Sequence, residues 1–307
     1  MSEQTYEVVI IGGGPAGLTA GLYASRAGLK SLLLEKGVFG GQITNAEHVE
    51  NFPGFPEGIS GIELGDRMRD QASKYGLKIE CAEATALEVG QAAKVVKTAD
   101  AAYGAGALIL AGGSVRKKLG AVGEDKYVGK GVSYCATCDG AFFRDMPVVV
   151  VGGGDAALTE ALHLSKHASS VTVIHRRHQL RATRILQDRA FADKKIRFLW
   201  STTVEGVEGN DVVTRLKLVN VQTTRPSYLE TAGVFVSIGF EPATEIVRGL
   251  LPLDEVGHVI TDEKMETSVR GILAAGDIRH NSGRQAITAA GDGATAAINA
   301  QKYLVEA

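Results

Sequence analysis

Two cysteines three positions apart, followed directly by an acid, are the residues whose types and spacing most clearly suggest chemistry: Cys135, Cys138 and Asp139. A Cys-x-x-Cys pair can close into a disulfide and reopen as a dithiol, whose thiolate is the reactive form. Asp139 is placed to exchange a proton with the sulfur that leaves. Half of a zinc site is the alternative, but that site needs a second Cys or His pair at ligand spacing. The third cysteine, Cys81, is isolated, so we predict no metal site and expect Cys81 to be a small buried hydrophobe in a strand.

A glycine-rich turn near the start of the chain predicts a first dinucleotide site. The turn runs Gly12-Gly-Gly14-Pro-Ala-Gly17. It follows an apolar strand and opens a helix that ends near Gly28, and the next strand ends at Glu35. In this context the backbone N–H groups and the helix N-terminus would hold a pyrophosphate, and Glu35 would accept a hydrogen bond from a ribose hydroxyl.

The same pattern returns 140 residues later, after a strand of four valines, as Gly152-Gly-Gly154-Asp-Ala-Ala. Here the position that matches Glu35 holds His175, and three arginines follow: Arg176, Arg177 and Arg181. A carboxylate at this position selects a free 2′-hydroxyl, whereas arginines accommodate a 2′-phosphate. The chain is therefore predicted to carry two dinucleotide sites, of which the second takes NADP(H).

The elements that must position these residues alternate between short apolar strands and helices, which predicts an α/β fold. One helix is expected over 62–75, and an Ala-rich helix is expected from Ala286 to about Leu304. The apolar stripe of the second helix is expected to pack in the core; it consists of Ile287, Ala290, Ala294 and Ile298. His163 and His167 have a spacing that can hold a metal, but an exposed helix face is the better interpretation.

Composition limits the classes of protein that need to be considered. The 307 residues suffice for two domains, and 45% hydrophobic and 22% charged residues are typical of a globular protein. A net charge of −2 without a basic run gives no sign of nucleic acid binding. No secretory signal or membrane span is visible. Three cysteines, two of them in one motif, fit a reducing compartment, so a cytoplasmic location is expected.

With these residues assembled, the chain closely resembles the low-molecular-weight thioredoxin reductases. The motifs that carry the resemblance lie within 135–155, 175–181 and 275–286. The resemblance implies two doubly wound, Rossmann-like dinucleotide-binding domains and a homodimer. It places a discontinuous FAD domain at 1–114 and 246–307, with an NADPH domain at 115–245 that carries the cysteine pair.

The resemblance also implies ligand-binding residues, which we carry over by position. Those expected to bind FAD are Gly12, Gly14, Pro15, Ala16, Gly17, Glu35, Lys36, Gly40, Gly41, Gln42, Asn51, Gly276, Asp277, Arg284, Gln285 and Ala286. Those expected to bind NADPH are Gly152, Gly154, Asp155, Ala156, His175, Arg176, Arg177 and Arg181. Two departures stand out, because relatives often have threonine at Gly112 and some have asparagine at Asp155.

The implied reaction passes electrons from NADPH to FAD, then to the Cys135–Cys138 disulfide, and finally to oxidised thioredoxin or a thioredoxin-like protein. In this scheme Cys138 faces the flavin, Cys135 attacks the partner's disulfide, and Asp139 is the acid and base. Phe142 and Phe143 either help to dock thioredoxin or belong to the core. The alternatives are a related flavoprotein reductase or a dithiol oxidase that acts on another protein or small molecule, and a nucleotide-sensing protein that catalyses nothing.

Overall fold

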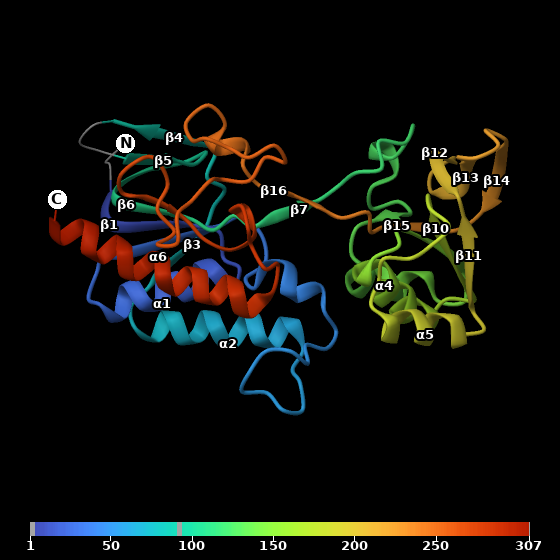
Figure 1. The fold of residues 1–307 in the computed structure, drawn as a ribbon, viewed down its shortest axis with the longest axis horizontal. Helices are drawn as coiled ribbons and strands as arrows, with labels where there is room; N and C mark the ends of the chain where they lie inside the picture. The colour runs from blue at the N-terminus through green and yellow to red at the C-terminus, as the bar shows by residue number, and fades with distance from the viewer. Residues whose placement is uncertain (1–3, 91–93, 307) are drawn as a thin grey trace. The chain divides into compact units, whose positions relative to one another are not determined.

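The computed structural model describes residues 4–90 and 94–306, which form two compact units (Figure 1). The first unit comprises Met1–Val115 and Glu241–Ala307, and the second comprises Arg116–Phe240. The sequence placed the corresponding boundaries at 114/115 and 245/246. At the two chain crossings, β7 (Ser114–Arg116) and β16 (Phe240–Pro242) pair with each other.

A mostly parallel sheet forms the centre of the first unit. Its strand order is β3-β2-β1-β6-β5-β4, and β17 also pairs with β6. The parallel strands are β1 (Gln4–Ile11), β2 (Ser31–Glu35), β3 (Lys78–Cys81), β6 (Ala102–Leu110) and β17 (Ile272–Ala274). The antiparallel edge consists of β5 (Lys94–Lys97) and β4 (Ala86–Val89). The helices are α1 (Pro15–Arg26), α2 (Gly61–Lys74) and α6 (Ala286–Glu306), and the 3₁₀ turns are η1 (Gly41–Asn45), η4 (Glu245–Val247) and η5 (Gly276–Ile278).

The second unit repeats this plan on a smaller scale. Its parallel sheet has the order β11-β10-β9-β15-β8. The strands are β8 (Val132–Ser133), β9 (Pro147–Val151), β10 (Ser170–His175), β11 (Ile196–Trp200) and β15 (Gly233–Val236). An antiparallel sheet contains β12 (Thr202–Gly209), β13 (Val213–Asn220) and β14 (Pro226–Glu230). The helices are α3 (Ala136–Asp139), α4 (Asp155–Ser165) and α5 (Arg184–Ala192), and the 3₁₀ turns are η2 (Asp125–Tyr127) and η3 (Gly140–Phe143).

In both units the direction of winding reverses beside the strand that precedes the glycine turn. The chain winds from β1 to β2 and β3, and then returns to place β6 on the other side of β1. In the second unit it winds from β9 to β10 and β11, and β15 returns to the other side of β9. Ligands of doubly wound sheets bind at this switch point, beyond the carboxyl ends of the strands. The predicted doubly wound α/β class is confirmed, and each glycine turn lies at a switch point.

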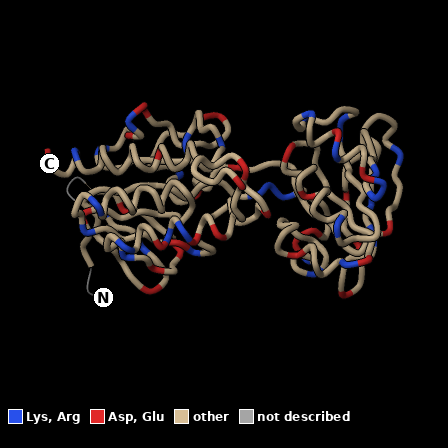
Figure 2. Tube along the Cα trace, turned by 90° about the horizontal axis from the view of Figure 1, so that it is seen from below, with Lys and Arg blue, Asp and Glu red and all other residues tan. Residues whose placement is uncertain are grey.

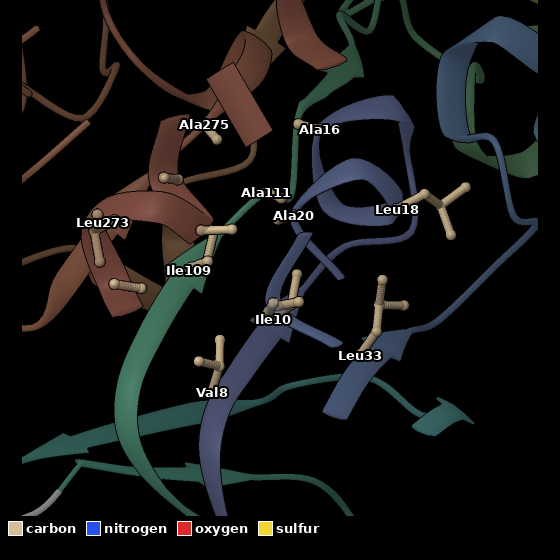
Figure 3. Packing of buried hydrophobic residues seen from close by; sticks show 14 of the residues in the cluster. Val8, Ile10, Ala16, Leu18, Ala20, Leu33, Ile109, Ala111, Leu273 and Ala275 are labelled. Carbon is tan, nitrogen blue, oxygen red and sulfur yellow. The ribbon is translucent and has the colours of Figure 1, made fainter. Parts of the chain in front are cut away.

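The core of the first unit is built from small residues where its helices meet (Figure 3). Helices α1 and α6 pack so closely that a Cβ atom on Gly293 would lie 2.0 Å from the carbonyl oxygen of Ala16. The buried face of α6 therefore consists of glycine, alanine and small polar residues. Ile287 and Ile298 are 41% and 42% exposed. The predicted apolar stripe was wrong for these two isoleucines, because a branched side chain does not fit where the helix backbones approach so closely.

Cys81 is a second correction. It is the last residue of β3, as a strand position was expected, but β3 is an edge strand and the Cys81 side chain is exposed. Figure 2 shows acidic and basic residues interspersed along both units. Within the described residues, no helix is long and apolar enough to cross a membrane.

A buried ion pair in the second unit predicts a pH-dependent stability. Glu160 on α4 is 8% exposed, and Nη1 of Arg116 lies 2.6 Å from its Oε1. Neither carboxylate oxygen makes a hydrogen bond of regular geometry with the described residues. Burial raises the pKa of Glu160 from 4.5 to about 7, although Arg116 opposes the rise. The folded state therefore holds a proton between about pH 4.5 and 7 that the unfolded chain releases.

The proton bound to Glu160 contributes up to about 3 kcal/mol to the free energy of unfolding. This stabilisation is fully present below pH 4.5 and is lost as the pH rises through 7. We expect the free energy of unfolding to fall more steeply between pH 5 and pH 8 in the unaltered protein than in Glu160→Gln. Urea unfolding followed by the fluorescence of Trp200, the only tryptophan and a residue of β11, reports on this unit. Parallel pH profiles for the two proteins would contradict the assignment.

Candidate active site

The cysteine pair lies just beyond β8, at the carboxyl edge of the second unit's sheet. Cys135 and Cys138 form a disulfide with their Cα atoms 5.3 Å apart. Cys135 caps the single turn of α3, because its Sγ accepts a hydrogen bond from the N–H of Cys138 at 3.2 Å. Ala136, which is 2% exposed, packs into the core and fixes this turn to the unit. Cys138 is exposed and Cys135 is half-buried, so the two residues of the pair differ in exposure.

Asp139 is held beside the pair by contacts that the sequence did not predict. Its N–H donates to the carbonyl oxygen of Cys135 at 3.1 Å. Its Oδ2 accepts a hydrogen bond from the hydroxyl of Ser133 at 2.6 Å. The only sequence signal for Ser133 was its place two residues before the first cysteine.

The two phenylalanines near the pair have different environments. Phe142 is 77% exposed. Phe143 packs edge-on against Phe235, with ring centroids 5.3 Å apart and ring planes at 77°. Phe143 therefore belongs to the core, whereas Phe142 presents an apolar surface close to the disulfide in sequence.

The first glycine turn is shaped by close backbone contacts that leave one open position. Gly12 has φ of +110°, and a Cβ there would lie 2.3 Å from the carbonyl oxygen of Ala111. A Cβ on Gly17 would lie 1.8 Å from the carbonyl oxygen of Gly12. By contrast, a Cβ on Gly14 would meet no atom within 4 Å, and α1 begins after Gly14 without a side-chain cap. The first N–H groups of α1 therefore face space that an anionic group can enter.

Glu35 at the end of β2 is hydrogen-bonded both to this turn and to the loop that follows β2. Its Oε2 accepts from the N–H of Gly13 at 2.5 Å, and its Oε1 accepts from the N–H of Gly37 at 2.6 Å. A cavity of about 650 Å³ opens beside it. The cavity is lined by Gly12, Glu35 and Lys36, by residues 82–85 after β3, and by residues 241–246. Residues 82–85 were missed because a loop without a motif gives no sequence signal.

The other residues expected at this site come from segments distant in sequence. Gly40 donates its N–H to the carbonyl oxygen of Gly13 at 2.8 Å. Asn51 donates to the side-chain oxygen of Gln285 at 3.0 Å, across more than two hundred residues of chain. The structure therefore brings the loop after β2 and the start of α6 together at this edge of the sheet.

The loop before α6 has an internal network centred on Ser282. The Ser282 hydroxyl donates to Oδ1 of Asp277 at 2.9 Å and accepts from the N–H of Arg284 at 3.2 Å. Arg284 has a positive φ of 51°, an uncommon conformation for a residue with a side chain. Asp277 and Arg284, both expected site residues, are thus fixed relative to each other by a serine that the sequence did not indicate.

The second glycine turn is also shaped by a close backbone contact and also leaves one open position. Gly152 has φ of +153°, and a Cβ there would lie 2.1 Å from the carbonyl oxygen of Ser237. A Cβ on Gly154 would meet no atom within 4 Å, and α4 starts after Gly154 without a side-chain cap. Asp155 accepts from the N–H of Thr183 at 2.6 Å, which ties the following loop to the start of α4.

His175 and the arginines line two neighbouring cavities in this unit. The larger, about 490 Å³, is lined by residues 152–156, His175, Arg176, Arg181 and residues 237–240, among others. The smaller, about 300 Å³, is lined by residues 176–181, Ser201, Val221 and Gln222. Burial lowers the pKa of His175, and the positive arginines lower it further. Nε2 of His175 is buried and has no hydrogen-bond partner among the described residues.

Two alanine substitutions should separate folding from ligand binding at the second turn. We expect Gly154→Ala to leave the urea unfolding midpoint unchanged and to weaken the binding of NADP⁺ at least about tenfold, because its methyl group would fill space reserved for an anionic group. Gly152→Ala should instead lower stability by at least about 2 kcal/mol, because its Cβ would overlap backbone atoms. Calorimetric titration and urea unfolding measure the two effects. Unchanged affinity in a folded Gly154→Ala protein would contradict the proposed location of the ligand.

Residues 6–293 match the model of the pyridine nucleotide-disulphide oxidoreductase family. The chain belongs to this family. Proteins of Listeria innocua and Bacillus subtilis named thioredoxin reductase are each 47% identical to it over 305 residues, which cover 99% of this chain and 95% and 96% of theirs. The crystal structure of Lactococcus lactis thioredoxin reductase matches with a TM-score of 0.94 at 42% identity, over 98% of this chain and all of the other. The crystal structure of T. acidophilum thioredoxin reductase matches with a TM-score of 0.91 at 34% identity, over 99% of this chain and all of the other. A chain with two nucleotide-type glycine turns and a disulfide shortly before the second of them is consistent with this family.

Proposed function

We propose that this protein is an NADPH-dependent thioredoxin reductase that uses FAD and the Cys135–Cys138 disulfide. The observation that carries the proposal is a disulfide in a chain with two glycine turns whose neighbouring side chains have opposite charge. One turn is hydrogen-bonded to the carboxylate of Glu35, and the other lines a cavity together with Arg176 and Arg181. The relatives named above, which share the fold over nearly the whole chain, support the same activity.

The first unit has the features of a FAD site. The open position at Gly14 and the uncapped start of α1 suit a pyrophosphate. Glu35 keeps lone pairs for a ribose hydroxyl, since each of its oxygens accepts a single hydrogen bond, one from Gly13 of the turn and one from Gly37. Asp277, Arg284 and Gln285 would contact the remainder of the cofactor. When bound, FAD would supply the chemistry that accepts a hydride and delivers two electrons to a disulfide.

The second unit has the features of an NADPH site. The uncapped start of α4 faces open space at Gly154 and would receive the pyrophosphate. Arg176, Arg177 and Arg181 line the smaller cavity, which would take the 2′-phosphate. Because its pKa is lowered, His175 would contribute a neutral ring to the nucleotide pocket. On this basis the first unit is the FAD-binding domain and the second is the NADPH-binding domain that carries the disulfide.

In the proposed reaction the sulfur of Cys138 receives the electron pair, and the S–S bond breaks. Cys135 then leaves as a thiolate and exchanges a proton with Asp139. The reduced Cys135 attacks the disulfide of oxidised thioredoxin, and Cys138 resolves the mixed disulfide. Phe142, exposed and three residues beyond Asp139, would be an apolar contact for the docked thioredoxin.

A homodimer and a cytoplasmic location complete the proposal. Tyr23 on α1 and Ile298 on α6 are exposed and line a shallow cavity of about 280 Å³. An apolar surface on this helix pair supports a contact with a second copy of the chain. A working Cys-x-x-Cys dithiol suits a reducing compartment.

Turnover with a panel of purified disulfide proteins tests the function. We expect the FAD-loaded protein to oxidise NADPH when an oxidised thioredoxin is present, and to do so far more slowly with NADH. Oxidised glutathione is tested as an alternative substrate to thioredoxin, and reduced ferredoxin is tested as an alternative electron donor to NADPH. Turnover with glutathione disulfide but with no thioredoxin, or reduction driven only by ferredoxin, would favour the related reductases over this proposal.

A further inference from the structure

A buried serine connects the proposed acid to the first cysteine. Ser133, at the end of β8, is 4% exposed and precedes Cys135 by two residues. Its Oγ accepts a hydrogen bond from the N–H of Cys135 at 3.0 Å. Its hydroxyl lies 2.6 Å from Oδ2 of Asp139 and 3.2 Å from the carbonyl oxygen of Cys135.

The single hydrogen of the hydroxyl decides how this network is arranged. A serine hydroxyl has one O–H donor and two lone pairs. Of its two possible acceptors, the Asp139 carboxylate is nearer and carries charge, so it takes the hydrogen. The chain of bonds then runs from the N–H of Cys135 to Ser133 and from Ser133 to Asp139. While the hydroxyl donates to Oδ2, the proton of a protonated Asp139 is carried on Oδ1; a proton on Oδ2 would require the hydroxyl to turn to the carbonyl oxygen of Cys135, which is the longer contact at 3.2 Å.

We propose that Ser133 is a positioning residue for the disulfide chemistry, which holds Asp139 against the Cys135 segment and directs the carboxyl proton to Oδ1. The inference rests on the proposed function, in which Asp139 exchanges a proton with the leaving sulfur. It adds the residue that selects which oxygen of Asp139 carries that proton.

The step balances with a simple dithiol as reductant. A thiolate of dithiothreitol bonds to Sγ of Cys138, the more exposed residue of the pair. The S–S bond breaks, the electron pair stays on Sγ of Cys135, and that sulfur takes the proton from Oδ1 of Asp139. The second thiol of dithiothreitol releases its proton to solvent and displaces Sγ of Cys138 as a thiolate, which takes up a proton from solvent, so that two protein thiols and oxidised dithiothreitol remain. Ser133 favours this step because its hydrogen bond is stronger to the carboxylate that forms than to the neutral acid.

The test measures how fast dithiothreitol reduces the disulfide in the FAD-loaded protein. Samples are quenched in acid and alkylated, and the new thiols are counted by mass spectrometry, with exposed Cys81 as a constant reference label. We expect Asp139→Asn to slow reduction about a hundredfold and Ser133→Ala to slow it about tenfold. Adding Ser133→Ala to Asp139→Asn should change the rate less than about twofold, because a residue that acts through another has no separate effect once that residue is removed.

Two further variants separate positioning from a general loss of structure. Ser133→Thr keeps the hydroxyl and should restore most of the rate lost in Ser133→Ala. Ser165→Ala removes another buried hydroxyl of this unit, which donates only to the carbonyl oxygen of Leu162 among the described contacts, and should leave the rate unchanged. The inference is overturned if the disulfide of Ser133→Ala is reduced at the normal rate, or if that of Ser133→Thr is reduced as slowly as that of Ser133→Ala. It is also overturned if adding Ser133→Ala to Asp139→Asn slows reduction as strongly as Ser133→Ala slows it in the unaltered protein.

These outcomes do not depend on NADPH or on thioredoxin. A protein that fails to reduce thioredoxin but shows the expected pattern with dithiothreitol would disprove the proposed partner and leave the role of Ser133 intact. A protein that reduces thioredoxin but lacks the pattern would disprove the role of Ser133 alone.

Discussion

Cys138→Ser is expected to lower the rate of thioredoxin reduction by at least about a thousandfold, while NADPH still bleaches the yellow colour of the FAD-loaded protein. The reason is that Cys135 and Cys138 form the disulfide through which electrons must leave. Cys135→Ser should be equally inactive with thioredoxin, because neither single cysteine can form or resolve the disulfide. Stopped-flow absorbance measures the bleaching, and turnover with oxidised thioredoxin measures the transfer.

Cys81→Ser is the matched control for the cysteine variants. Cys81 is exposed at the end of β3 in the other unit and lies outside the disulfide. Its replacement should leave both rates within about twofold. Thioredoxin reduction at the normal rate by either variant of the pair would show that the disulfide is not on the path of electrons.

The second large effect is expected on coenzyme choice. Replacing Arg176 and Arg177 with alanine should raise the KM for NADPH about a hundredfold or more and change the KM for NADH by less than about threefold. Both side chains line the smaller cavity. Each charge-assisted bond to a phosphate contributes about 1.5–3 kcal/mol, and NADH has no 2′-phosphate to lose.

A variant that removes two positive charges elsewhere controls for the overall charge. Arg215 and Lys217 lie on β13 and pair with Glu208 and Glu205. Replacing both with alanine should leave the preference for NADPH intact. An unaltered protein that used NADH and NADPH equally well would contradict the assignment of the second site.

Patterns that depend on local backbone geometry could be predicted from the sequence. The turns at Gly12 and Gly152 could be identified because each glycine occupies a backbone position with positive φ beside the carbonyl group of a residue that directly follows another strand. The strand of four valines before the second glycine turn was predicted, and it is β9. The Cys-x-x-Cys pair was identified because a disulfide within one helical turn depends on neighbours three residues apart.

Features that depend on contacts between distant segments could not be predicted. The buried face of α6 was misjudged at Ile287 and Ile298, because helical periodicity does not show how closely α1 approaches. Cys81 was placed in the core because the sequence gives no indication that β3 lies at a sheet edge. The contacts of Ser133 and Ser282 were also missed, although each joins residues within six positions of each other, because the sequence does not show where a serine hydroxyl points.

The stoichiometry of the complete reaction tests the central claim most directly. The FAD-loaded protein, a limiting amount of NADPH and excess oxidised thioredoxin are combined without oxygen, and the thiols formed on thioredoxin are counted. Because NADPH is a two-electron donor, we expect two new thioredoxin thiols for each NADPH consumed, and none when Cys135 or Cys138 is serine. Consumption of NADPH without thioredoxin thiols, or thiol formation by the serine variants, would contradict it.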